Sequence, residues 1–324
     1  MYSFFLFSGT FISISSSSLF GMRMGLEINL MSFIPMIINL ENNKKSSEAA
    51  IKYFLIQAVA SAIVIFSSLY FYLYSGYTFS NAPNIMITLA LAMKLGMAPF
   101  HFWFPEVLEG LNWMNSLLLL TWQKISPMVI LSIFFYSNTL IILALFSALT
   151  GAISGLNQTS MRKILAFSSI SHIGWMTSVM YLNSSIWIDY FMFYSFTSFI
   201  ICLSFWLLNL NYFSQLTLLQ NLNEKFIIFI NLLSLGGLPP LLGFLPKWIA
   251  MLVISKNSPI LIILISSTLI TLYFYTRLCF STFTLFIQSI VWNQKNKSTK
   301  NFYLLSILTL FSLTGIIPFS LMNL

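Results

Sequence analysis

Residues 236–247 read Gly-Gly-Leu-Pro-Pro-Leu-Leu-Gly-Phe-Leu-Pro-Lys and lie inside an apolar stretch over residues 226–254. Proline removes a backbone donor and clashes with the preceding turn, while glycine tolerates the irregular backbone that results. At membrane depth such a break is stable only where protein or a water-filled cavity satisfies the freed backbone groups. The stretch therefore predicts a discontinuous membrane helix, and a kinked packing helix is the plainer alternative.

The composition of the whole chain indicates a membrane protein. Of its 324 residues 58% are hydrophobic and 7% are charged, whereas soluble domains carry about 25% charged residues. The apolar runs are continuous and roughly 20 residues long, which suits helices and not alternating barrel strands. We expect an all-α integral membrane protein with eleven transmembrane helices, at residues 3–19, 21–40, 50–75, 84–104, 112–135, 138–156, 163–182, 188–211, 226–254, 259–287 and 302–322.

A second interruption and the spacing of polar residues predict an internal repeat. The fourth helix contains Lys-Leu-Gly-Met-Ala-Pro-Phe at residues 94–100, and Lys94 and Lys247 are 153 residues apart, as are Lys124 and Arg277. A repeat with an odd number of spans must insert upside down the second time. We predict discontinuous helices four and nine in two inverted five-helix repeats, at residues 1–135 and 136–290, and then a loop and final helix at 291–324.

The basic residues between the predicted helices indicate the orientation. Loops after odd-numbered helices carry two basic residues, Arg23 and Lys256, and loops after even-numbered helices carry nine: Lys44, Lys45, Lys52, Arg162, Lys163, Lys225, Lys295, Lys297 and Lys300. Positive loops stay on the inner side of a membrane. The N-terminus is therefore predicted inside and the C-terminus outside, and the first apolar stretch, which lacks a charged leader, is expected to remain as a helix.

Three lysines lie where lipid disfavours charge. Lys94 and Lys124 fall about eleven and thirteen residues into their helices, and Lys247 follows the second break. A charge at the bilayer centre costs at least about 2.5–3.5 kcal/mol, and such residues usually mark an ion or proton path. The alternative for Lys94 and Lys124 is a buried ion pair that fixes helix packing. The alternative for Lys247 is a loop lysine that reaches the interface.

Two further groups complete the candidate site. Glu27 lies inside the second helix one turn after Arg23, so it can pair locally or reach Lys94. His172 lies mid-helix among serines and is either a relay group or a hydrogen-bonded core histidine. The remaining ionisable residues near helix ends are expected to be interfacial, and the cysteines are expected to be buried apolar residues: His101, Glu106, Glu109, Asp189 and Arg277, with Cys202 and Cys279.

This set of residues favours proton transfer. A buried lysine beside a switchable acid can load and release a proton, and lysines with a histidine at one depth make a lateral relay. The sequence shows no phosphate-binding glycine loop, zinc motif or haem-attachment motif, and no redox centre is expected in this chain. A free-standing cation/proton antiporter and a purely structural membrane scaffold are the alternatives.

Five stretches together are specific enough to suggest a family, and they span most of the chain. They are GLEINL at 25–30, KLGMAPFHFWFPEVLEG at 94–110, TWQKISP at 121–127, GLNQTSMRKILAFSSISHIGW at 155–175 and SLGGLPPLLGFLPKW at 234–248. The chain thereby resembles the mitochondrial antiporter-like, membrane-arm subunits of respiratory complex I, the NADH–ubiquinone oxidoreductase, in an insect-like version.

The resemblance implies specific roles. Glu27 and Lys94 would form a coupled pair, Lys124 a central relay, and Lys247 the lysine of the second broken helix, while His172 matches a relay position less firmly. It implies proton pumping coupled to NADH oxidation and ubiquinone reduction, with NADH, FMN, iron–sulfur clusters and ubiquinone handled by other subunits. The partners would be neighbouring antiporter-like and accessory subunits and lipids such as cardiolipin, with no nucleic acid, in the mitochondrial inner membrane. The N-terminus would face the matrix and the C-terminus the intermembrane space.

Overall fold

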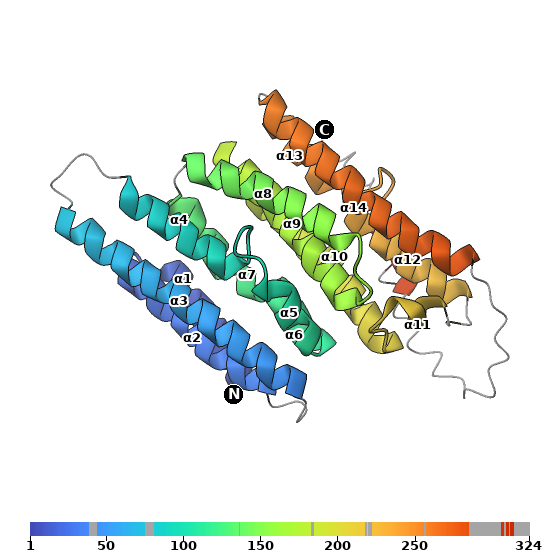
Figure 1. The fold of residues 1–324 in the computed structure, drawn as a ribbon, viewed down its shortest axis with the longest axis horizontal. Coiled ribbons are helices and arrows are strands. Elements are labelled where there is room, and N and C mark those ends of the chain that lie inside the picture. The colour runs from blue at the N-terminus through green and yellow to red at the C-terminus, as the bar shows by residue number, and fades with distance from the viewer. Residues whose placement is uncertain are drawn as a thin grey trace.

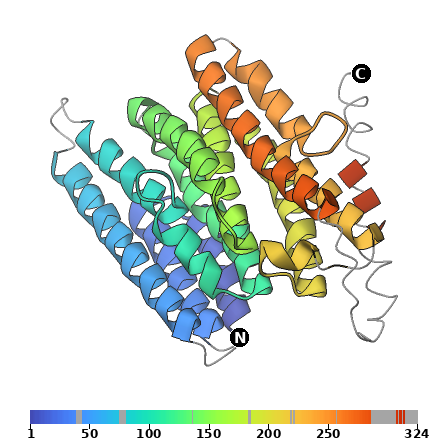
Figure 2. The same ribbon diagram turned by 45° about the vertical axis from the view of Figure 1, so that its right-hand side comes forward.

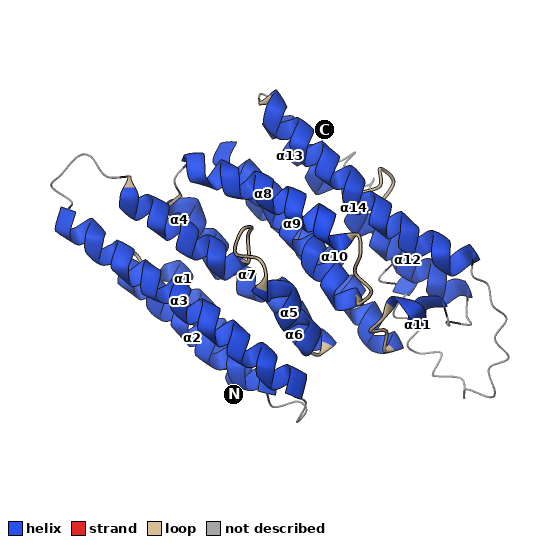
Figure 3. Ribbon diagram, in the orientation of Figure 1, coloured by secondary structure: helices blue, strands red, loops and turns tan. Residues whose placement is uncertain are grey.

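The computed structural model describes residues 1–324 except 39–43, 75–80, 136, 183–184, 218, 220–221, 256, 285–305, 308, 311 and 314–324. The described part is built from helices and short connections without a sheet (Figure 3). One isolated antiparallel bridge joins Ser160 and Tyr212. The all-α prediction is confirmed for this part of the chain.

Fourteen helices are defined among the described residues. In chain order they are α1 (Tyr2–Ser15), α2 (Leu19–Ile38), α3 (Lys44–Tyr74), α4 (Ala82–Leu95), α5 (Trp103–Gly110), α6 (Trp113–Leu120), α7 (Trp122–Ile133), α8 (Ser137–Gly155), α9 (Met161–Leu182), α10 (Ile186–Leu208), α11 (Phe213–Thr217), α12 (Leu222–Gly236), α13 (Phe244–Ile254) and α14 (Ser258–Thr284). The first ten predicted spans match one helix or two consecutive helices each. The eleventh, 302–322, lies mostly outside the described residues.

Five segments of the described chain are long and apolar enough to cross a membrane. They are Lys44–Phe71, Trp113–Ile133, Asn138–Gly155, Ile186–Leu208 and Ser258–Phe280, and shorter apolar helices cover Tyr2–Ser15, Ala82–Leu95 and Phe244–Ile254. Helix α9 is long but rich in serine, and most of its residues are buried inside the protein. A helix surrounded by protein need not be apolar on every side, which is consistent with the serines of α9.

The helices run roughly alongside one another in the order of the chain (Figure 1). Helices α1–α3 form one flank, α8–α10 the middle and α12–α14 the other flank, and the turned view keeps this order (Figure 2). Helix α9 contacts α5, α6, α8, α10, α13 and α14. A polar side chain on α9 can therefore reach groups on α5 and α6 as well as on α13 and α14.

Two helix pairs approach closely because small residues face each other. Helix α1 packs on α2 and α8 packs on α9. A Cβ atom added to Gly25 would lie 2.7 Å from the Gly9 carbonyl oxygen, and one added to Gly174 would lie 2.7 Å from the Ala144 carbonyl oxygen. Small residues let membrane helices pack by direct backbone contact.

Both predicted breaks are present. Helix α4 ends at Gly96, whose φ is +73°, and α12 is followed by Gly237, whose φ is +82°. In this left-handed region a Cβ atom is disfavoured, so glycine ends the helix at low cost. The chain then turns past prolines and starts a new helix at Trp103 in one case and Phe244 in the other.

The spacing of the two breaks differs from the spacing of the two lysines. The glycines with positive φ, Gly96 and Gly237, are 141 residues apart, and the starts of α5 and α13 are also 141 apart (237 − 96; 244 − 103). Lys94 and Lys247 are 153 residues apart, because Lys94 lies before its break and Lys247 after its own.

The predicted fifth helix is also interrupted. Helices α6 and α7 meet at Thr121, whose φ and ψ are −114° and −73°. Its hydroxyl donates to the Leu117 carbonyl at 2.8 Å, and the Lys124 amide donates to the Thr121 carbonyl at 3.2 Å. Pro127, inside α7, cannot donate to the carbonyl four residues earlier, that of Gln123. The irregular backbone angles at Thr121 and the missing amide hydrogen of Pro127 both interrupt regular helical hydrogen bonding near Lys124.

Candidate proton-transfer site

Lys94 lies in the last turn of α4, directly before the first break, and only 6% of the residue is exposed. The break around it is held by side chains, since Gln57 Nε2 donates to the Lys94 carbonyl at 3.2 Å and Trp103 Nε1 donates to the Met93 carbonyl at 3.2 Å. Among the described residues its ammonium has neither a hydrogen-bond nor an ion-pair partner.

Lys124 lies in the first turn of α7 and is 3% exposed. Its Nζ donates to the Tyr194 hydroxyl at 3.3 Å. The ammonium also lies 5.0 Å from the centre of the Tyr194 ring and 5.2 Å from that of Phe104. Aromatic faces attract cations, and more strongly where water is excluded. Lys124 therefore connects α5 and α7 with α10 of the second half.

His172 lies on the buried helix α9, which contacts α5 and α6 as well as α13 and α14. Its Nδ1 is 2.9 Å from the Tyr190 hydroxyl, and its ring centre is 5.1 Å from that of Tyr194. Tyr194 also accepts the hydrogen bond of Lys124, so His172 and Lys124 contact the same tyrosine.

Lys247 lies on α13 just after the second break and is 5% exposed. Its Nζ donates to the Gly236 carbonyl, which is at the end of α12, at 2.6 Å. Carbonyls at a helix C-terminus lack helical partners and carry partial negative charge, which suits an ammonium. A Cβ on Gly237 would lie 2.9 Å from Lys247 Cδ, so this glycine also makes room for the lysine.

Glu27 forms an ion pair with Arg23, one turn earlier on α2. Arg23 Nη2 lies 2.6 Å from Glu27 Oε1, and the two side chains are 20% and 31% exposed. Both charges are near enough to act on Lys94, with opposite signs. Of the two arrangements that the sequence left open, the structure contains the pair with Arg23 and not a contact with Lys94.

Most of the residues expected at the interface are exposed or half-buried, and one is buried. Asp189 and Glu106 are exposed, Glu109 is half-buried, and Arg277 Nη1 donates to the Leu156 carbonyl at 3.3 Å. His101 is the exception, because it is 8% exposed and its ring stacks on Phe102 in the turn of the first break. Sequence position alone could not show that the His101 side chain is buried while its neighbour Phe102 is exposed. Cys202 is buried, and Cys279 is half-buried.

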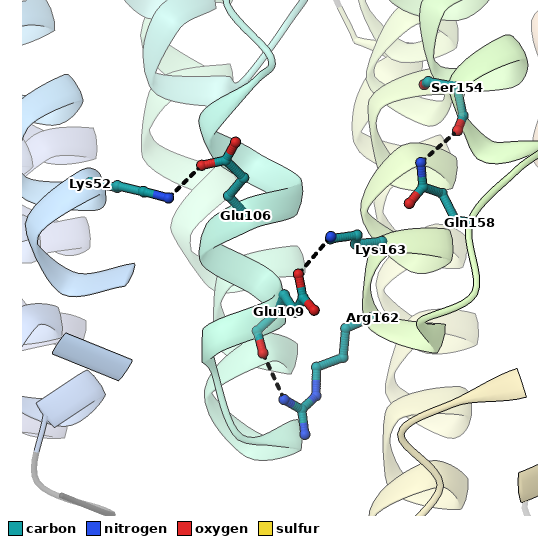
Figure 4. Close-up of polar contacts among 7 residues, drawn as sticks. All are labelled: Lys52, Glu106, Glu109, Ser154, Gln158, Arg162 and Lys163. Carbon is teal, nitrogen blue, oxygen red and sulfur yellow. Dashed lines mark hydrogen bonds and ion pairs between the residues drawn. The ribbon is translucent and has the colours of Figure 1, made fainter. Parts of the chain in front are cut away.

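Carboxylates on α5 join it to helices on both sides (Figure 4). Lys52 Nζ of α3 lies 2.7 Å from Glu106 Oε2, and Lys163 Nζ of α9 lies 2.6 Å from Glu109 Oε2. Arg162 donates to the Glu109 carbonyl at 2.9 Å. The half-helix after the first break is therefore anchored to α3 and to α9.

The arrangement of helices and broken segments matches a known family. Residues 16–273 match the family described as NADH:quinone oxidoreductase/Mrp antiporter, transmembrane region. The chain belongs to this family. Among its relatives, NADH-ubiquinone oxidoreductase chain 2 of Anopheles gambiae is 47% identical over 98% of this chain and 95% of the relative, and the protein of the same name from Locusta migratoria is 43% identical over 96% and 93%.

Solved structures share the fold. A chain of respiratory complex I from Thermus thermophilus with bound aureothin superposes with a TM-score of 0.82 at 22% identity, covering 96% of this chain and 76% of that one. A chain of the Mrp complex from Dietzia sp. DQ12-45-1b superposes with a TM-score of 0.73 at 15% identity, covering 91% and 61%. At these identities the likeness concerns the fold alone.

Sequence reasoning missed the tyrosines of this family member. Tyr190 and Tyr194 lie one turn apart on α10, are 2% and 3% exposed, and contact His172 and Lys124. The only available signal was their i, i+4 spacing, which is equally typical of a packing face.

Proposed function

We propose that this chain is a proton-translocating membrane-arm subunit of respiratory complex I. Other subunits would oxidise NADH and reduce ubiquinone with FMN and iron–sulfur clusters, and this chain would move protons through Lys94, Lys124, His172 and Lys247. The observation that carries the proposal is the burial of these four ionisable side chains, each at most 6% exposed, in one protein. The names of the relatives support the assignment to the NADH-ubiquinone oxidoreductase.

The contacts support an order for the relay. A proton on Lys94 passes to Lys124, an N–H bond breaking on the first as one forms on the second. Lys124 donates to Tyr194, whose ring packs on His172. The charge of Lys247 acts in turn on His172. Lys247 is itself stabilised by the Gly236 carbonyl at the second break. In the two further proposed steps an N–H bond of the donor, Lys124 and then His172, breaks as one forms on the acceptor, His172 and then Lys247, all of which can hold a proton reversibly.

Glu27 is proposed to control the first lysine. When it pairs with Arg23, as it does here, much of its attraction for a proton on Lys94 is offset by the arginine charge. A movement of Glu27 from Arg23 toward Lys94 would favour the ammonium form. Lys94 would then load and release its proton as Glu27 changes partner.

The topology is proposed to follow two inverted five-helix repeats within eleven spans, at residues 1–135 and 136–290. The equal spacing of the two breaks supports the repeat. Loop charges support a matrix N-terminus and an intermembrane-space C-terminus in the mitochondrial inner membrane. Neighbouring antiporter-like subunits, accessory subunits and lipids such as cardiolipin would cover the exposed apolar side chains on α1, α3 and α14.

The test is the replacement of Lys94 or Lys247 by methionine, which has similar length and no charge, in the assembled complex. Protons moved per electron should fall while NADH oxidation by the hydrophilic subunits persists. Normal stoichiometry with normal assembly would contradict the relay. A free-standing antiporter would instead migrate alone on a native gel, without NADH dehydrogenase activity, and would exchange a cation for protons.

A further inference from the structure

Ser312, near the end of the chain, contacts both sides of the second break. Its Oγ donates to Asn231 Oδ1 at 3.1 Å, and Asn231 lies on α12, before the break. The hydroxyl also lies 2.8 Å from the Thr309 carbonyl, so its hydrogen is shared between the two oxygens. The Ser312 carbonyl accepts from the Leu242 amide at 3.1 Å, and Leu242 lies in the turn between α12 and α13. One buried residue, 1% exposed, thus joins the helix before the break to the turn after it.

The turn at this break has backbone groups that the two helices do not pair. Pro239 and Pro240 have no amide hydrogen, and the Leu242 amide lies beyond the end of α12. Irregular backbone at membrane depth is stable only where other parts of the protein satisfy its polar groups. The Ser312 carbonyl is the acceptor that satisfies Leu242. The first break is likewise held by a residue of another helix, Gln57 of α3.

The turn also packs directly onto the end of α12. A Cβ atom on Gly243 would overlap the Ser234 carbonyl oxygen, so the two backbones are in contact. Gly236, two residues further along α12, has the carbonyl that accepts from Lys247 at 2.6 Å. The contacts of Ser312 therefore hold together the end of α12 and the start of α13, which are the two elements that the Lys247 hydrogen bond joins.

We infer that Ser312 is a positioning residue for Lys247. By holding the Leu242 turn against Asn231, it keeps α13 where the Lys247 ammonium meets the Gly236 carbonyl. Without this contact the turn can move away from α12, and the ammonium loses its acceptor. The effect on proton transfer rests on the proposed function of Lys247, whereas the effect on the turn does not. The final segment of the chain thereby acts on the relay as well as on packing.

The test compares Ser312→Ala with Ser312→Thr in the intact complex, because alanine removes the hydroxyl that reaches Asn231 and threonine keeps it. In Ser312→Ala, hydrogen exchange of the amides in residues 241–245 should become roughly two- to tenfold faster, the factor expected for one neutral hydrogen bond. Protons moved per electron should fall, and Ser312→Thr should restore both values. The matched control is Ser267→Ala, since Ser267 is a buried serine of α14 whose hydroxyl donates to the Leu264 carbonyl of its own helix at 2.7 Å.

The two measurements separate the positioning role from the relay. Unchanged exchange in Ser312→Ala, or equal effects of the alanine and threonine variants, would overturn the inference, because the hydroxyl would then not hold the turn. Faster exchange with normal pumping would overturn it too when Lys247→Met lowers pumping. If Lys247→Met leaves pumping normal, the proposed relay fails, and the exchange rates alone decide whether Ser312 holds the turn.

A second variant covers the case in which Ser312→Ala does not assemble. Asn231→Leu removes the other partner of the same hydrogen bond with little change in volume, and it should give the same faster exchange. If neither variant assembles, a high-resolution density map of the unmodified complex decides. Ser312 must contact both Asn231 and Leu242 there, and a position away from either one would overturn the inference.

Discussion

At the scale of single residues, each buried lysine is accommodated in a different way. Lys247 donates to the Gly236 carbonyl, Lys124 faces a hydroxyl and two rings, and Lys94 borders a cavity. Burying an unpaired charge is costly, so an ammonium in a protein needs acceptors, dipoles or water around it. These surroundings keep both protonation states accessible, as a relay group requires.

The first prediction concerns Tyr194→Phe. The variant keeps the aromatic face beside Lys124 and removes the hydroxyl that accepts its hydrogen bond. A hydrogen bond to a charged group contributes about 1.5–3 kcal/mol, so proton pumping should slow markedly while assembly is preserved. Pumping by reconstituted complex measures this. Tyr273→Phe, at an exposed position of α14, is the control, and equal pumping by the two variants would refute a role for the hydroxyl.

A second prediction concerns Gly237→Ala. The φ of +82° disfavours any Cβ, and the added atom would lie 2.9 Å from Lys247 Cδ. Backbone strain of this kind costs about 1–3 kcal/mol, and displacement of Lys247 from the Gly236 carbonyl should lower pumping. If the effect acts through Lys247, Gly237→Ala should cause no further loss in a Lys247→Met background. Additive losses would show a separate cause.

At the scale of elements, the interrupted helices bring polar backbone into the protein interior. Helix α4 followed by α5, and α12 followed by α13, leave carbonyls that side chains then use. The continuous helices α8 and α9 do the opposite, because their small residues allow direct backbone packing. His172 lies on α9, so its position depends on that packing.

The third prediction is that Gly174→Leu disrupts the contact of α8 with α9. A Cβ at this position would already lie 2.7 Å from the Ala144 carbonyl oxygen and 2.8 Å from the Ala148 amide nitrogen. Overpacking costs typically about 1–3 kcal/mol and shifts the backbone. We expect reduced assembly on native gels and a lower melting temperature. Met192→Leu, on the exposed side of α10, should assemble normally.

At the scale of the whole molecule, α5 joins helix α3 to helix α9. It contacts α3 on one side and α9 on the other, and each contact includes an ion pair. Arg162 adds contacts to the Glu109 carbonyl, to the Asn211 side chain at 2.7 Å and to the Trp113 ring at 5.3 Å. One arginine thereby connects the α9 start with α5, α6 and the segment after α10.

The fourth prediction compares two neighbouring residues at this junction. Lys163→Met removes one partly exposed ion pair, which should lower stability by at most about 1 kcal/mol. Arg162→Met removes hydrogen bonds to two partners and the ring contact, so its effect should be clearly larger. Thermal unfolding of the purified complex measures the difference. Equal melting temperatures for the two variants would contradict the connecting role of Arg162.

Several features of the fold could be predicted from the sequence because they depend on local chemistry. Prolines and glycines placed both breaks correctly, and the apolar runs located the helices at the first ten predicted positions. The break at Thr121 was missed, because a single threonine in an apolar helix gives no such signal. The inverted repeat stays a prediction, and the 141-residue spacing of the two breaks differs from the 153-residue spacing of the lysines.

The sequence by itself determined that the chain is helical, that it belongs in a membrane and that Lys94, Lys124, Lys247 and His172 are the unusual residues, because hydrophobicity, proline and charge act locally. Only the tertiary structure decided which groups meet. It paired Glu27 with Arg23, brought Tyr194 to Lys124 across 70 positions and formed a cavity beside Gln123. Such contacts arise from the packing of distant helices, which no local pattern specifies.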